Sequence, residues 1–342
     1  MRKGKVLSFG EILLRICPDL SQDWIGAGTL PFYIGGAELN VASALALWGL
    51  PSAYVSAMPQ NELTVDILKH LNVKGIDVER MLLQGDRLGL YYLPKGKDVK
   101  HTGVIYDRAH SSFANIKRSD IDWDFLFKDV SWFHFSAICP AIAQEIADIC
   151  LEALQEATRR NIFISLDLNY RSKLWKYGKQ PVEVMPTLAA YSDLIMGNVW
   201  AAHTMLGIAL DPELQETKSF YTNTLLIEQA KETSIEIVSA FEKCRFVANT
   251  FRFDYLDKGI QYFTTFFGQE QFLVSQEYIA EQIVDRVGSG DCFMAGLIYG
   301  MYQNMDMHNT LEFATAAAFD KLFIASDATD STVADIQKRI KK

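Results

Sequence analysis

The chain has 342 residues, 49% of them hydrophobic, which suffices for one large α/β domain with a smaller subdomain and argues against disorder. A formal net charge of -9 disfavours nucleic acids and anionic membranes as partners, because both attract basic surfaces. The five cysteines form no CxxC pair and are odd in number, which argues against a disulfide framework or a zinc site and favours reduced, buried thiols.

The N-terminal segment predicts two strands and no targeting signal. Residues 5–18, KVLSFGEILLRICP, are typical of a strand, a glycine break and a second strand that ends at Pro18. Gly10, Glu11 and Arg15 interrupt the apolar run and no small-residue cleavage site follows, so we expect no signal peptide. No stretch reaches the length of a transmembrane helix. We therefore expect a cytoplasmic protein.

The next elements alternate between helix and strand. Residues 35–50, GGAELNVASALALWGL, place apolar side chains at helical spacing after a Gly-Gly turn. A short strand over 52–59 and an amphipathic helix over 63–76 follow. Such alternation indicates an α/β fold with a mostly parallel sheet covered by helices. Residues 87–112 differ, because two β-rich runs around a polar turn predict a hairpin that leaves the main sheet.

The alternation resumes after this hairpin. The later strands at 246–251 and 259–268 are expected to be antiparallel, and 211–242 reads as helix and loop. The other expected elements are strands over 130–138, 162–171 and 194–198, and helices over 143–161, 181–193, 292–303 and 311–325.

The segment DRVGSGDCFMAG, residues 285–296, is the first candidate for chemistry. Gly288, Ser289 and Gly290 precede Asp291 at a helix start, where unpaired N–H groups and a partial positive charge can bind an anion. No Lys follows as in a Walker A loop, and no strand with GxGxxG opens the chain as in a Rossmann site. The alternative is an ordinary helix cap, which stabilises a protein by about 0.5–2 kcal/mol.

A second polar cluster follows a predicted strand. Asp167, Asn169 and Arg171 in DLNYRSKLW stand where a parallel strand ends, which is where ligands bind in open α/β sheets. Arg171 offers a bidentate fork for a carboxylate or phosphate. The alternative interpretation is a solvated loop.

The hairpin provides a third candidate. Tyr106 and Arg108 alternate on one strand and therefore point to the same face, and Tyr91 lies on the other strand of the hairpin. Together they could hold a polar ligand. The alternative is a cross-strand aromatic pair with an arginine that extends to solvent.

The fourth candidate is GGAELN. Gly35 and Gly36 allow the backbone to approach a small molecule, and Asn40 lies on the first helical turn, although a tight turn with a capping role is the alternative. The six histidines have no metal-ligand spacing, and His134 is expected to be a core residue. The sequence therefore identifies no metal ligands.

These four patterns, in this order, resemble the ribokinase-like (PfkB) carbohydrate kinases. GGAELNVASALALWG is similar to the N-terminal Gly-Gly signature of that family, and DRVGSGDCFMAG to its C-terminal signature, with Ser289 in the usual Ala position. Within the family, YDRAHSS and DLNYRSKLW most resemble the 2-keto-3-deoxygluconate kinases. Fructokinases share the second segment and usually differ in the first.

The resemblance implies a single domain over 1–342 with a three-layer ribokinase-like fold and a small β-sheet lid over 12–34 and 87–112. It implies transfer of the ATP γ-phosphoryl group to a sugar acid, most closely 2-keto-3-deoxygluconate, which would give the 6-phosphate, with Mg²⁺ as cofactor. Asp291 would be the base, and Gly288, Ser289 and Gly290 the anion hole. The implied sugar contacts are Gly35, Gly36, Asn40, Tyr91, Tyr106, Arg108 and Arg171, and the implied nucleotide contacts are Asn198, Thr250 and Arg252.

Two electrostatic expectations follow. The helix dipole should keep Asp291 ionised and hence a weak base, which suffices if the sugar hydroxyl loses its proton late in the reaction. Arg108 and Arg171 suit a sugar acid better than a neutral sugar, because a desolvated carboxylate needs a charge partner.

The sequence departs from the family pattern on the nucleotide side. Ala201 stands where family members commonly carry a Glu that organises magnesium, and the usual Thr-x-Gly-x-x-Gly stretch is not recognisable near Thr250 and Arg252. Within the family, a fructokinase-like enzyme is the alternative to a sugar-acid kinase. A catalytically weak, regulatory sugar-acid-binding protein is another. The family lid also suggests a homodimer formed through the lid.

Overall fold

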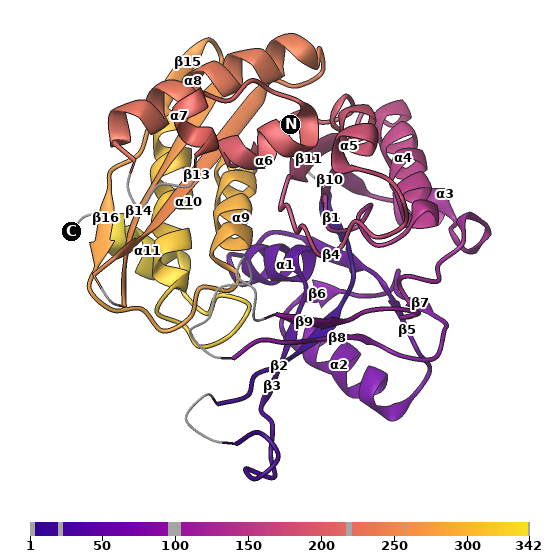
Figure 1. Cartoon of the computed structure of the whole chain (residues 1–342). Coiled ribbons are helices and arrows are strands. Elements are labelled where there is room, and N and C mark those ends of the chain that lie inside the picture. The colour runs from indigo at the N-terminus through magenta and orange to yellow at the C-terminus, as the bar shows by residue number, and fades with distance from the viewer. Residues whose placement is uncertain (1–3, 20–22, 95–103, 217–220, 257, 341–342) are drawn as a thin grey trace.

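Two main β-sheets organise the chain (Figure 1). The computed structural model describes residues 4–19, 23–94, 104–216, 221–256 and 258–340. Residues 20–22 and 95–103 of the predicted lid, and 217–220 of the segment expected to be helix and loop, lie outside the described residues.

The larger sheet is parallel in its centre and antiparallel at one side. Its strands are β1 (Lys5–Phe9), β4 (Ser52–Val55), β6 (Ile76–Asp77), β10 (Val130–Ser136), β11 (Phe163–Asp167), β12 (Leu194–Gly197), β13 (Phe246–Tyr255), β14 (Gly259–Gly268), β15 (Gln271–Val274) and β16 (Tyr278–Ala280). Within the described residues they follow the order β15-β14-β13-β12-β11-β10-β1-β4-β6, with β16 also paired to β14. The pairs from β6 to β13 are parallel, and β14 pairs antiparallel with β13, β15 and β16. The predicted mostly parallel sheet with late antiparallel strands is confirmed.

Helices cover both faces of this sheet, as the predicted alternation requires (Figure 1). Neighbouring strand residues enter opposite cores: Val6 packs with the helices α1, α9, α10 and α11, and Leu7 with α4, α5, α6 and α8. The helices are α1 (Ala37–Leu47), α2 (Glu62–Val73), α3 (Trp123–Leu126), α4 (Gln144–Arg159), α5 (Pro181–Ala189), α6 (Val199–Leu206), α7 (Pro212–Gln215), α8 (Asn223–Ala240), α9 (Ser289–Tyr302), α10 (Met307–Lys321) and α11 (Val333–Ile340). The result is a three-layer sandwich.

The second sheet, which we call the lid sheet, is separate from the first. It has the order β3-β2-β8-β9, made of β2 (Leu13–Ile16), β3 (Phe32–Gly35), β8 (Gly89–Tyr92) and β9 (Ile105–Asp107). The strands β8 and β9 form the predicted antiparallel hairpin. A short additional pair joins β5 (Ala57–Met58) to β7 (Leu82–Leu83). Figure 1 shows the lid sheet on the side of α1 and α2, below the larger sheet.

Two glycines stand directly before helices at positions where a neighbouring carbonyl group leaves no space for a side chain. Gly36 precedes α1 with a φ of 143°, and a Cβ there would lie 2.5 Å from the carbonyl oxygen of Glu11. Gly288 precedes α9 with a φ of 80°, and a Cβ there would lie 1.9 Å from the carbonyl oxygen of Asp327. Both positions therefore require glycine for backbone angle and for space.

The remaining expectations about the core also hold. All five cysteines are buried thiols outside disulfides. His134 is buried in β10, its Nδ1 lies 3.0 Å from Ser165 Oγ, and burial lowers its pKa to about 3. Among the residues that the structure describes, no helix has the length and apolarity needed to span a membrane.

Candidate active site

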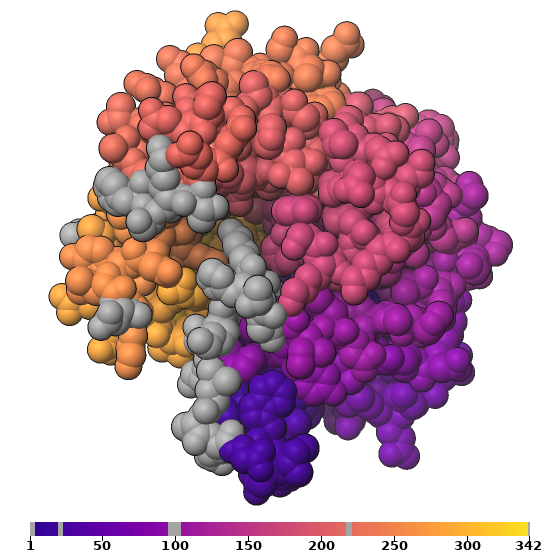
Figure 2. Space-filling view, viewed as in Figure 1, coloured from indigo at the N-terminus to yellow at the C-terminus, as the bar shows by residue number. Residues whose placement is uncertain are grey.

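A cavity of about 550 Å³ opens where the parallel strands end. The segments that follow β11 and β12 form one wall, the lid sheet another, and the start of α9 closes it. Figure 2 shows a hollow at the centre of the face in view, between the salmon segment above and the magenta segment on the right. This position at the carboxyl edge of the sheet is the usual ligand site of open α/β folds.

The cavity gathers nearly all the residues predicted from the sequence. The predicted residues that line it are Gly36, Asn40, Tyr91, Tyr106, Arg108, Arg171, Asn198, Thr250, Arg252, Gly288, Ser289, Gly290 and Asp291. They come from strands of both sheets, from the segments that follow β9, β11 and β12, and from the helix starts at α1 and α9.

Gly35 is the predicted sugar contact that does not line the cavity. It lies at the end of β3, where a Cβ would stand 2.3 Å from Oδ2 of Asp327. The absence of a side chain at Gly35 therefore makes room for a buried carboxylate and not for a ligand.

The turn before α9 has the form of an anion site. The first helical bond runs from Cys292 N–H to Gly288 O at 2.9 Å, so the N–H groups of the three preceding residues have no partner within the helix. A Cβ on Gly290 would meet no atom within 4 Å, which leaves open space above the turn. Ser289 Oγ points the other way and donates to Ala318 O at 3.0 Å. An anion can therefore approach the backbone here.

Asp291 lies in the first turn of α9 and is only 8% exposed. Its pKa is raised to about 8, first by burial and then by the nearby carboxylates of Asp167 and Glu38, while the Asn40 hydrogen bond and the charge of Arg171 act in the opposite direction. Burial therefore favours the neutral form of Asp291, in contrast to the expectation that the helix dipole keeps it ionised.

Asn40 connects α1 to this carboxyl group. Its Nδ2 donates to Asp291 Oδ2 at 2.7 Å. Its Oδ1 is buried and has no hydrogen-bond partner among the residues that the structure describes. A buried acceptor left unpaired costs free energy, so a ligand hydroxyl that donates to Asn40 would relieve that cost.

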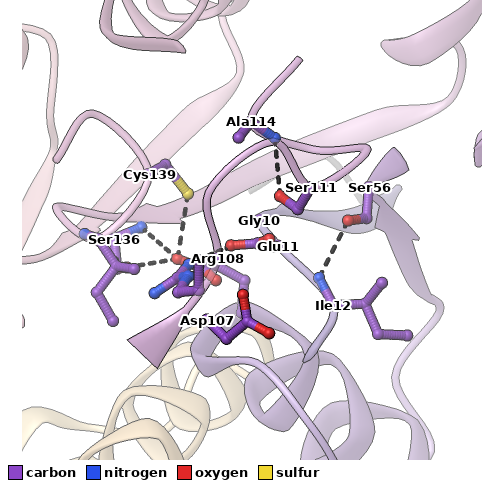
Figure 3. A network of polar contacts seen from close by, with 12 residues as sticks. Gly10, Glu11, Ile12, Ser56, Asp107, Arg108, Ser111, Ala114, Ser136 and Cys139 are labelled. Carbon is purple, nitrogen blue, oxygen red and sulfur yellow. Dashed lines mark hydrogen bonds and ion pairs between the residues drawn. The ribbon is translucent and has the colours of Figure 1, made fainter. Parts of the chain in front are cut away.

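Arg108 is held by a buried partner that the sequence analysis did not identify (Figure 3). Its Nη2 and Nε lie 2.5 and 2.6 Å from Oε2 of Glu11, and both side chains are almost fully buried. Because Glu11 offsets its charge, Arg108 is a weaker partner for a sugar carboxylate than the sequence suggested.

Glu38 is another buried carboxyl group near the pair of Arg108 and Glu11. Glu38 accepts hydrogen bonds from the N–H and hydroxyl of Ser136, and Cys139 Sγ lies 3.4 Å away. Burial raises the pKa of Glu38, which favours its neutral form.

Cations on the β11 side remain close to the ligand space. Arg171 lines the cavity, and its Nη1 donates to Tyr170 O at 3.0 Å. Lys173 also lines the cavity, and its Nζ donates to Val104 O of the lid hairpin at 3.0 Å. The loop after β11 therefore brings the positive charges of Arg171 and Lys173 to the cavity and contacts the lid hairpin at Val104.

The residues expected on the nucleotide side form the opposite wall. Asn198 caps α6 by accepting from the N–H of Ala201 at 2.8 Å. Thr250 Oγ1 lies 3.4 Å from Gly197 O, and Arg252 Nη1 donates to Arg286 O at 3.1 Å. Arg252 and Arg286 both line this wall and can contact a polyphosphate, although the charge of Arg286 is offset by Asp254, whose Oδ1 lies 2.5 Å from Arg286 Nη1.

The donor set suits a metal ion that arrives with a nucleotide. No cluster of three or more His, Cys, Asp or Glu side chains arranged to hold a metal occurs in the described part of the chain. Among the residues that the structure describes, the carboxylates that line the cavity are Asp167 and Asp291. Mg²⁺ commonly uses one or two protein carboxylates together with phosphate oxygens and water. These residues therefore fit Mg²⁺ bound to ATP.

Some cavity residues were not predicted. Lys173 stands within the DLNYRSKLW segment and Arg286 immediately precedes the glycine turn, so their positions beside recognised motifs could have indicated them. Trp200, Thr204 and Tyr262 carry no comparable local signal.

Comparison with known proteins agrees with this geometry. Residues 3–319 match the model of the pfkB family carbohydrate kinases. The chain is 25% identical to the 2-dehydro-3-deoxygluconokinase of Bacillus subtilis over 92% of its own length and 88% of the relative. It is 32% identical to the 2-dehydro-3-deoxygalactonokinase of Haloferax volcanii, in a match that spans 50% of this chain and 54% of that one.

A solved structure is similar over the whole chain. The crystal structure of 2-dehydro-3-deoxygluconokinase from Thermotoga maritima superposes with a TM-score of 0.87 and 32% identity, covering 99% of this chain and 100% of the other. The predicted ribokinase-like architecture is therefore confirmed. With a family match that extends over most of its length, the chain belongs to the pfkB family of carbohydrate kinases.

Proposed function

We propose that the protein transfers the γ-phosphoryl group of ATP to 2-keto-3-deoxygluconate (2-dehydro-3-deoxygluconate) and forms its 6-phosphate. The observation that carries this proposal is a buried carboxyl group, Asp291, at an open helix start and facing a wall that contains Arg171 and Lys173. A base, an anion site and cations for a substrate carboxylate thus share one cavity.

Asp291 acts as the base for the sugar hydroxyl. Its pKa of about 8 makes it a stronger proton acceptor than an exposed aspartate, once it is ionised. ATP supplies the phosphoryl group when bound. The first N–H groups of α9, beside Gly290, stabilise the negative charge that gathers on the transferred group.

The substrate class follows from charge. A sugar carboxylate loses water when it enters the cavity and requires a cation or hydrogen-bond donors in exchange. Arg171 and Lys173 supply the charge, since Arg108 is paired with Glu11. Asn40 Oδ1 is the unpaired acceptor available to a sugar hydroxyl.

The nucleotide lies on the opposite side of the cavity, against Asn198, Thr250, Arg252 and Arg286. Asp167 would be the protein carboxylate for a magnesium ion that arrives with ATP, because Asp291 serves as the base. Because Ala201 cannot supply the family's acidic side chain, we expect a higher free Mg²⁺ requirement than in relatives that have it.

An assay of ADP release with Mg-ATP and a panel of sugars tests the proposal. The panel contains 2-keto-3-deoxygluconate, its galacto epimer, fructose and gluconate. We expect the highest kcat/KM for a 2-keto-3-deoxy sugar acid. Turnover of fructose alone would establish the fructokinase-like alternative instead.

A regulatory sugar-acid-binding protein is the second candidate, and the absence of a carboxylate at Ala201 favours it. Calorimetry separates the two functions. Tight binding of the sugar acid without ADP release at any Mg²⁺ concentration would support the binder.

We further propose that the lid sheets of two copies pair in a cytoplasmic homodimer. Cross-strand register aligns Phe32, Ile16, Tyr92 and Ile105 in one row across the sheet. Phe32 and Ile105, at the two ends of the row, are 53% and 54% exposed. An apolar row of this kind is typical of an interface.

A further inference from the structure

The strongest buried charge cluster outside the proposed chemistry centres on Arg15 of the lid strand β2. Arg15 is completely buried. Its Nη2 lies 2.6 Å from Asp285 Oδ2, its Nε lies 2.8 Å from Asp327 Oδ1, and its guanidinium stacks 4.8 Å above the ring of Tyr33. No role in binding sugar or ATP accounts for it, since it does not line the cavity.

Three strands of the lid sheet converge on the same carboxylate. Arg15 reaches Asp327 from β2, and Tyr91 of β8 donates to Asp327 Oδ2 at 2.8 Å. Gly35 at the end of β3 leaves space for that oxygen, because a Cβ there would stand 2.3 Å from it. The lid sheet is therefore fixed to a segment that follows α10 in the chain.

The same carboxylates shape the anion turn. Asp285 Oδ1 accepts from the N–H of Val287 at 3.2 Å. The carbonyl oxygen of Asp327 lies against Gly288, where a Cβ would stand 1.9 Å away, and the stem of Lys321 lies 3.2 Å from that same point. The turn that precedes Asp291 thus rests directly on the Arg15 cluster.

The cluster is balanced in charge, with Arg15 and Lys321 opposite Asp285 and Asp327. A buried ion pair of this kind is weak support for stability, since apolar residues of equal volume often serve as well. The cluster instead fixes geometry, because the planar guanidinium group of Arg15 holds two carboxylates at defined angles.

We infer that Arg15 is a positioning residue for phosphoryl transfer: it holds the lid sheet and the anion turn in one arrangement, so that the sugar hydroxyl faces the phosphoryl group. The inference rests on the proposed function. Small displacements of reacting groups are costly, as about 1 Å can lower a rate by about 100-fold. Arg15 touches neither substrate and acts through Asp285, Asp327 and Tyr91.

The test compares two charge-balanced double variants. Arg15→Met with Asp327→Asn removes one cation and one anion from the cluster. Arg80→Met with Asp77→Asn is the matched control, since Arg80 is a buried arginine whose Nη1 lies 2.5 Å from Asp77 Oδ2, away from the cavity. Melting temperature, kcat and both KM values are measured with whichever sugar the wild type phosphorylates, so an incorrect substrate assignment does not affect the comparison.

We expect the Arg15 double variant to lose about 10–100-fold in kcat, whereas the control keeps kcat within about threefold at a comparable loss of melting temperature. If the Arg15 double variant has the same kcat as the Arg80 double variant, the inference is overturned and the Arg15 cluster has only a structural role.

A milder variant covers the case in which the double variant does not fold. Arg15→Lys keeps the charge but replaces the planar fork by a single ammonium group. We expect a lower kcat at an unchanged fold, as judged by circular dichroism. Wild-type kcat in Arg15→Lys would contradict the positioning role.

Discussion

The hydrogen bond from Asn40 to Asp291 provides a direct test of the base. Burial raises the pKa of Asp291 to about 8, so only about 10% of it is ionised at pH 7. Asn40 Nδ2, 2.7 Å from Oδ2, favours the ionised form. Replacing Asn40 with Ala removes this donor and should raise the pKa of Asp291 further.

The size of the effect follows from the contact. A hydrogen bond to a charged group contributes about 1.5–3 kcal/mol, which places the pKa of Asp291 in Asn40→Ala at roughly 9–10. The ionised fraction at pH 7 then falls about 10–100-fold, and kcat/KM falls with it, since this ratio reports the free enzyme. At pH 9 the wild type is already mostly ionised, so the deficit shrinks to about 2–10-fold.

The assay is the pH profile of kcat/KM from pH 6 to about 10 for both proteins. Gln229→Ala is the control, because Gln229 is a buried amide outside the cavity and should lower stability without moving the profile. A loss in Asn40→Ala that is equal at every pH would refute the reasoning and assign Asn40 to sugar contact alone.

Four further variants test the proposals. Asp291→Asn should abolish turnover. Because the folded-state pKa of Asp291 is raised, its stabilising contribution is present below about pH 4 and is lost as pH rises to about 8. Asp291→Asn should therefore have a higher melting temperature than wild type above pH 8 and an equal one near pH 4. The same difference in melting temperature at both pH values would contradict the raised pKa. Arg171→Met should raise KM for a sugar acid about tenfold or more and leave KM for a neutral sugar unchanged, whereas similar effects on both would argue against carboxylate recognition. Ala201→Glu should lower the Mg²⁺ concentration needed for half-maximal rate, as a magnesium titration would show. Phe32→Glu should convert a dimer to a monomer in light scattering, and an unchanged mass would exclude the lid interface.

Several features of the fold could be predicted because they depend on local pattern. The strand and helix order followed from alternating apolar runs, and the hairpin from two β-rich runs around a polar turn. The cavity residues were found because short motifs keep neighbouring residues together. Asp291 with its glycine turn, and Arg171 after β11, are examples.

Local sequence patterns could not predict side-chain contacts between residues that are far apart in the sequence. Glu11 lies 97 positions from Arg108, and no motif joins them. Gly35 was assigned to the ligand because its spacing matched a motif. The structure instead places it against Asp327, a residue that no sequence pattern singled out.

The sequence by itself determined the α/β order of elements, the anion turn before Asp291 and the class of residues around the cavity, because each depends on neighbours within a few positions. Only the tertiary structure decided the protonation states of the cavity side chains. Asn40 and Glu38 are 251 and 253 positions from Asp291, and Asp167 is 124 positions away, yet together with burial they set its pKa. Desolvation and Coulomb interactions depend on distance in space, and that distance exists only once the chain has folded.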